Sequence, residues 1–158
     1  MKISGYIESV IYNNEDTGYS VLSVSAGKTF FTLVGNFISV KEGEYIEAEV
    51  EKVVNKKYGE QYEVKSYNIS FPSEIDAIEK YLASDEFPGI GPKFAKAITS
   101  QFGEDTFDVI ENEPERLFEV KGMNYKRHQV LVDFVARKTY ENEITLKLYN
   151  YDLSRALI

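Results

Sequence analysis

The sequence contains no cysteine and no tryptophan, and it has a single histidine. Without cysteine there is neither a disulfide framework nor a thiolate metal site, which is typical of a protein from a reducing compartment. The lone His128 has no second ligand with which to hold a metal, so we predict that it lies on a helix surface. No apolar run is long enough for a signal peptide or a membrane span, which predicts a cytoplasmic protein without a membrane partner.

Positive charge is also scarce. The chain has 18 lysines and arginines against 26 aspartates and glutamates, and a formal net charge of −8. Because lysine and arginine supply most contacts to a polyanion, the overall charge opposes nucleic-acid binding, and any such site must depend on local geometry. The acids are spread over solvent faces with no pairing that suggests acid–base catalysis.

A nucleotide-binding loop is missing as well. Residues 26–29, AGKT, invite comparison with a phosphate loop, but that motif requires a glycine where Leu22 stands and a helix after the lysine. The following TFFTLVGNF is typical of a strand, so Gly27 and Lys28 are predicted to form a hairpin turn. We therefore expect this chain to have no motor, no catalytic residue and no cofactor or metal of its own.

Residues 1–71 have the period of β-strands. EYIEAEVEKVV, for example, places Ile46, Ala48 and Val50 on one face and glutamates on the other. Five such runs, separated by turn-like segments, predict a small closed β-barrel. This period leaves two barrel types open, the OB-like and the SH3-like.

The period changes at Pro72, after which short helical segments are broken by glycine and proline. Ser73 is predicted to cap the first helix, with Ile75, Ile78 and Leu82 on its buried face. The predicted fold class is therefore α+β, with a five-stranded barrel over residues 1–71 and an all-α domain over residues 72–158.

Two segments of the helical half repeat each other after 33 residues. VKGMNYKRHQVL aligns with FPGIGPKFAKAI, and this places Asn124 where the first segment has Gly91. Asparagine tolerates left-handed backbone better than any residue but glycine, so Asn124 is predicted to replace Gly91 in the second turn. The alignment indicates two equivalent turn-and-helix units.

A glycine–apolar–glycine turn before a helix favours an anion site. The glycines allow close backbone approach, the apolar residue anchors the turn in the core, and the unpaired amides at the helix start face an anion. Such contacts hold a phosphate without reading bases. A purely structural turn is the alternative interpretation. The candidate residues are Gly89, Ile90, Gly91 and Lys93 in the first turn, which is the better candidate, and Gly122, Asn124 and Lys126 in the second.

The barrel offers another candidate in NKKYGEQY. Lys56, Lys57, Tyr58 and Tyr62 gather around one predicted turn. Aromatic rings stack on bases and lysines pair with phosphates, as a single-strand binding surface requires. A polar hairpin whose tyrosines pack inward explains the same pattern. The glutamates at 47, 49 and 51 make the neighbouring face unsuitable for DNA.

These stretches, taken together, resemble a known family. GIGPKFAKAI resembles the helix-hairpin-helix motif of DNA repair and recombination proteins. With GYIESVIYNNEDTGYSVLSV, KKYGEQYEVKSY and FGEDTFDVIENEPERLFEVKGM, it is similar to the amino-terminal region of RecD-like DNA helicases, also described as exodeoxyribonuclease V alpha-chain-like. The resemblance implies an OB-like barrel and tandem helix-hairpin-helix units, with an ATP- and magnesium-dependent motor elsewhere in the protein. YDLSRALI resembles a third, truncated hairpin, with Asp152 in place of a glycine.

The resemblance implies an accessory, non-catalytic region of an ATP-dependent helicase. Its expected partners are DNA, the motor domains and another repair protein. The expected contacts are sequence-independent and made to the DNA backbone, or the region positions the motor. The alternative is a protein-interaction module that braces the motor or recruits a repair partner. The net charge favours this alternative, and the intact GIGPK favours DNA.

Overall fold

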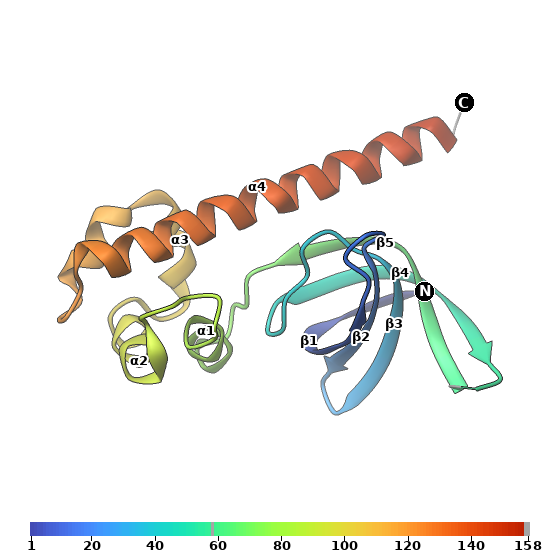
Figure 1. The fold of residues 1–158 in the computed structure, drawn as a ribbon, viewed down its shortest axis with the longest axis horizontal. Helices are drawn as coiled ribbons and strands as arrows, with labels where there is room; N and C mark the ends of the chain where they lie inside the picture. Colours follow the sequence, from blue (N-terminus) through green and yellow to red (C-terminus); the bar gives the residue numbers. More distant parts are fainter. Residues whose placement is uncertain (58, 157–158) are drawn as a thin grey trace. The chain divides into compact units, whose positions relative to one another are not determined.

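The structure is a computed structural model that describes the backbone of residues 1–57 and 59–156, and the side chains of these residues up to 144. The chain divides into two compact units. One consists of Met1–Ser70 with Glu141–Ile158 and contains the β-strands, and the other is Phe71–Tyr140 and is helical. Figure 1 shows the strands in blue to green and the helices in green to red.

The strands form a closed five-stranded barrel, as the sequence predicts. They are β1 (Lys2–Asn13), β2 (Tyr19–Ala26), β3 (Thr29–Asn36), β4 (Tyr45–Asn55) and β5 (Gly59–Ser70). Their order around the barrel is β1-β2-β3-β5-β4. All neighbours are antiparallel except β3 and β5, which pair in parallel. Gly27 has a φ of 67° in the turn between β2 and β3, so AGKT is a hairpin, as predicted.

The barrel interior is filled by one face of each strand. Alternate residues point inward because the side-chain period of a strand is two. At Gly5 of β1 the neighbouring strand comes so close that a Cβ atom would overlap the carbonyl oxygen of Ser25. The interior residues are Ile3, Ile7, Leu22, Val24, Leu33, Phe37, Val40, Ile46, Ala48, Val50, Tyr62 and Ile69.

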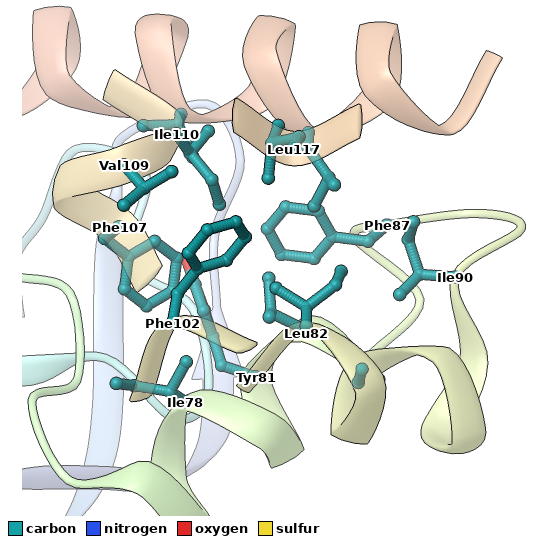
Figure 2. Close-up of a cluster of buried hydrophobic side chains, with 14 of the residues drawn as sticks. Ile78, Tyr81, Leu82, Phe87, Ile90, Phe102, Phe107, Val109, Ile110 and Leu117 are labelled. Carbon is teal, nitrogen blue, oxygen red and sulfur yellow. The ribbon is translucent and has the colours of Figure 1, made fainter. Parts of the chain in front are cut away.

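The helical unit consists of short helices around an aromatic core. Its elements are α1 (Ile75–Leu82), α2 (Gly91–Phe102), η1 (Gly103–Asp105), α3 (Thr106–Asn112), η2 (Pro114–Glu119) and the start of α4 (Tyr125–Ala156). Figure 2 shows side chains from these helices, such as Tyr81 and Phe107, converging on one cluster with Phe87 from the connection between α1 and α2. The rings of Phe87 and Phe134 lie 4.4 Å apart. Burial of these rings, together with the aliphatic side chains of the same cluster, stabilises the unit.

Three local predictions for the helical half of the chain are wrong. Ser73 does not cap α1, because the helix begins at Ile75 and Glu74 takes the capping position without a side-chain hydrogen bond. Ile75 is 45% exposed, since the first turn of α1 turns it away from the core. No turn interrupts the chain near Asp152, where a third hairpin was predicted, because α4 continues as one helix to Ala156. Residues 157 and 158, the end of that predicted hairpin, lie outside the described ones.

No helix within the described residues is both long and apolar enough to cross a membrane. In the same part of the chain, no cluster of three histidine, aspartate or glutamate side chains is arranged to hold a metal ion.

Candidate nucleic-acid site

An open groove lies on the outer face of the barrel. Its volume is about 540 Å³. It is lined by residues of all five strands, close to the β1–β2 loop and the β4–β5 hairpin. The lining residues are Ile11, Tyr12, Tyr19, Val21, Thr32, Asn55 and Gln61.

Two tyrosines give the groove exposed aromatic surface. Tyr12 and Tyr19 are 51% and 41% exposed, and they stand at the two ends of the β1–β2 loop. Their ring centroids are 6.4 Å apart with a tilt of 59°. These two residues were not predicted from the sequence, although tyrosines on both sides of the turn-like NNEDTG are a visible signal.

The loop between the tyrosines is held by its own hydrogen bonds. The Asn14 side-chain oxygen accepts from the amides of Asp16 and Thr17, at 2.9 and 3.2 Å. Gly18 donates to the Asn14 carbonyl and its own carbonyl accepts from the Phe37 amide, at 2.8 and 3.0 Å. Gly18 has a φ of 78°, and a Cβ there would lie 2.9 Å from the Phe37 carbonyl oxygen. The loop therefore presents Tyr19 from a well-defined backbone.

The predicted lysine hairpin borders this groove. Lys56 and Lys57 are exposed at the tip between β4 and β5, and the Lys57 amide donates to Asn55, a lining residue, at 2.8 Å. Tyr58 lies outside the described residues. Tyr62 is buried, with its ring 5.4 Å from that of Phe31, so the inward-packing interpretation is correct for this tyrosine.

The glutamates of β4 do not form an unopposed acidic face. Each of the three has a cation within ion-pair distance, and exposed pairs of this kind contribute little to stability but offset the local charge. Lys65 also bonds Glu63, and that hydrogen bond raises its pKa. The pairs are Glu47 with Lys2 at 3.4 Å, Glu49 with the Met1 amino group at 3.9 Å and Glu51 with Lys65 at 3.5 Å.

The first glycine turn has the geometry that its sequence predicts. Gly89 and Gly91 have φ values of 86° and 71°, and no described atom beyond the adjacent residues and the backbone of α2 lies within 4 Å of the Cβ position of either. Ile90 between them is 4% exposed and belongs to the aromatic core (Figure 2). Lys93 is exposed in the first turn of α2, and no side chain in the described part of the chain caps that helix. The backbone is accessible here.

The second turn differs from the first. Gly122 has a φ of 93°, but among the described non-glycine residues only Ser39 has a positive φ. Asn124 is therefore not a left-handed substitute for glycine, and that prediction is wrong. Its side-chain oxygen instead accepts from the Arg127 amide at 2.8 Å, which caps the start of α4. Lys126 is exposed beside Asn124. The Arg127 amide at the start of α4, however, already donates to Asn124 and is not free to bind an anion.

Arg127 joins the two turns. Its Nε atom donates to the Gly89 carbonyl at 3.1 Å, and its Nη1 atom donates to the Gly122 carbonyl at 2.7 Å. The guanidinium lies 4.6 Å from the ring centroid of Phe94 in α2. Phe94 also lies against the second turn: a Cβ atom added at Gly122 would be 3.3 Å from its ring. Phe94 and Arg127 are equivalent in the 33-residue alignment, so the contacts between the turns are reciprocal.

His128 is not the surface residue that the sequence predicts. It is half-buried, its ring stacks on Phe118 at 4.6 Å, and its Nε2 atom lies 3.1 Å from the Pro114 carbonyl oxygen. Because a carbonyl only accepts, Nε2 carries the proton in this contact. Its other ring nitrogen, Nδ1, is buried without a hydrogen-bond partner among the described residues. These contacts give His128 a packing role.

Comparison with known proteins agrees with this architecture. Residues 1–72 match the family model for the OB-fold domain of the ATP-dependent DNA helicase YrrC, which decides between the two barrel types. The ATP-dependent RecD2 DNA helicase of Deinococcus radiodurans is 23% identical over 161 residues, covering 97% of this chain and 22% of the relative. This chain thus spans less than a quarter of that relative's length. The resemblance stated from the sequence is confirmed: the barrel is similar to the YrrC-type OB-fold domain, and the chain to a RecD-like DNA helicase.

Proposed function

We propose that the chain is a non-catalytic accessory region of an ATP-dependent RecD-like helicase and that its barrel contacts single-stranded DNA without sequence preference. The observation that carries this proposal is the groove with Tyr12 and Tyr19. OB-folds bind oligonucleotides on the face of their second and third strands, between the first and the last hairpin loops. The groove has that location, with Tyr19 and Val21 from β2 and Thr32 from β3.

The chemistry of the groove suits a chain of bases. A base stacked on an aromatic ring gains about 1–3 kcal/mol whichever base it is. Lys56 and Lys57 at the neighbouring hairpin tip supply positive charge for phosphates. Because the net charge of −8 opposes a polyanion, we expect weak binding that is sensitive to salt.

We also propose that the two glycine turns belong to tandem helix-hairpin-helix units and that the first turn contacts a DNA phosphate. Support comes from the open backbone at Gly89 and Gly91, the uncapped start of α2 and the exposed Lys93. In the second turn, Asn124 occupies an amide at the start of α4, so Gly122 and Lys126 make the weaker contact.

In the whole protein, we propose that these contacts position ATP- and magnesium-dependent motor domains on DNA during cytoplasmic repair or recombination. The alternative, a module that binds a repair protein, is favoured by exposed aromatic side chains near the second turn of the helical unit. Phe118 and Tyr125 are 51% and 74% exposed. Aromatic residues are enriched in protein interfaces.

Alanine variants of the groove tyrosines test the proposal. Tyr12→Ala and Tyr19→Ala should each weaken the binding of a labelled single strand about tenfold, since each removes one stacking surface. Tyr140→Ala is the matched control, because Tyr140 is 64% exposed but belongs to the helical unit. Fluorescence anisotropy at low salt measures the affinities. If the wild type does not bind, or all three variants bind as it does, the groove is not a DNA site and the interaction module becomes the better interpretation.

A further inference from the structure

We infer that Arg127 is a positioning residue: it fixes the backbone of both glycine turns and thereby prepares the first turn for a phosphate, without touching DNA itself. The inference rests on the proposed role of the first turn. Nothing in the sequence repeat or in the comparisons assigns Arg127 a part.

The peptide group between Gly89 and Ile90 is held at both ends. Its carbonyl accepts the 3.1 Å bond from Arg127 Nε, and its amide donates to the Phe87 carbonyl at 3.3 Å. A peptide plane bonded on both sides cannot flip without losing two hydrogen bonds. The direction of the next amides, at the start of α2, is thereby determined.

The corresponding peptide of the second turn is held in the same manner. The Gly122 carbonyl accepts from Arg127 Nη1 at 2.7 Å, and the Met123 amide donates to Val120 at 3.1 Å. The two peptides are 33 residues apart, and so are the carbonyls of Phe87 and Val120 that accept from their amides. One guanidinium thus fixes two equivalent peptides and ties the turns together.

Most of the Arg127 guanidinium is already engaged within the protein, so little of it is available to contact DNA. Two of its nitrogens bond carbonyls, one face of its plane lies on Phe94, and the residue is half-buried. The exposed cation beside the first turn is Lys93. A lysine at position 127 would keep the charge but lose the planar fork that reaches two acceptors and stacks on a ring.

Fixing the turn matters because glycine is the most flexible residue. Ile90 anchors the turn in the core, but Gly89 and Gly91 have open space at their Cβ positions, so no side-chain packing restrains the two glycines themselves. A free turn would have to be ordered when DNA binds, and that ordering lowers affinity. Arg127 orders it beforehand.

Arg127→Lys and Arg127→Gln in the full chain test this inference, with Lys96→Gln, at an exposed position of α2 outside the turns, as a charge control. Amide hydrogen exchange, followed by NMR, should be about tenfold faster for both Ile90 and Met123 in Arg127→Gln, because a charge-assisted hydrogen bond is lost at each peptide. In Arg127→Lys it should be faster for at least one of the two, because an ammonium lacks the fork that reaches both carbonyls. Exchange at Ile98 and Leu131, buried in the same unit, should not change. Unchanged exchange at Ile90 and Met123, or equal acceleration at all four amides, would overturn the inference.

DNA affinity supplies the second measurement. For a labelled duplex, Arg127→Lys should weaken binding as much as Arg127→Gln, and the salt dependence should stay that of the wild type, because no phosphate contact is removed. Full binding by Arg127→Lys would overturn the inference, since charge alone would then suffice. If the wild type binds no DNA, the proposed function fails, and the exchange rates still decide whether Arg127 holds the turns.

Discussion

The two lysines beside the glycine turns provide a matched pair of charge reversals, Lys93→Glu and Lys126→Glu. Both side chains are exposed, both lie near a helix start, and they occupy equivalent positions of the repeat. They differ in the backbone beside them: α2 has no side-chain cap, while Asn124 caps α4. We expect Lys93→Glu to weaken DNA binding more than Lys126→Glu.

The size of the effect follows from the exposure of Lys93. Two unit charges 4 Å apart in water interact by about 1 kcal/mol, so a reversal from attraction to repulsion costs about 2 kcal/mol, or about thirtyfold in affinity at low salt. One phosphate contact contributes about 0.7–0.9 to the slope of log affinity against log salt, depending on the DNA. A fourfold rise in salt should therefore reduce binding of the wild type about threefold more than that of Lys93→Glu. Lys126→Glu should lose less than about threefold at low salt, because the helix amide beside it is already bonded.

Fluorescence anisotropy with a labelled duplex and a labelled single strand, over a salt series, measures both quantities. The loss should not depend on base sequence, because phosphate contacts carry no sequence information. Equal losses for the two variants would refute the distinction between the turns. No loss for either, in a wild type that binds, would show that the turns are structural and that binding resides on the barrel.

Two glycine substitutions probe the close contacts by thermal or urea unfolding. Gly5→Ala should destabilise the barrel by at least about 3 kcal/mol, since the new methyl overlaps the Ser25 carbonyl and a strand must move; a loss below about 1 kcal/mol would contradict this. For Gly89→Ala we expect a loss of about 1–2 kcal/mol, from the positive φ alone. Gly122→Ala should destabilise the helical unit more, because its new methyl group also displaces Phe94. Equal losses would show that Phe94 shifts freely.

Several features of the fold could be predicted because they depend on local sequence. The alternation in β4 reports the inner face of a strand directly, since neighbouring side chains point to opposite sides. The positive φ of Gly89 and Gly91 follows from a motif that few other residues can satisfy. The parallel pairing of β3 with β5 joins strands that are far apart in the chain, and the period of the strands does not specify it.

The candidate site shows where local sequence becomes ambiguous. Asparagine favours both the left-handed conformation and the capping position before a helix, and at Asn124 the start of α4 selects the second. The role of Arg127 depends on a contact 38 residues away, which no local pattern encodes. Tyr12 and Tyr19 were missed because each looks like an ordinary strand residue until the barrel brings them to one groove.

The meeting of Phe94 with Arg127 has a consequence for how a repeated unit can be built. Equivalent positions of two copies face each other here, so a perfectly duplicated sequence would place the same side chain on both sides. Two arginines would repel at this distance, and two phenylalanines would donate nothing to the carbonyls of Gly89 and Gly122. One ring and one guanidinium attract each other, and the guanidinium donates to both carbonyls. The two copies must therefore differ at this single position for the turns to approach closely. Exchanging Phe94 and Arg127 would preserve the close approach, whereas the same residue at both positions would not.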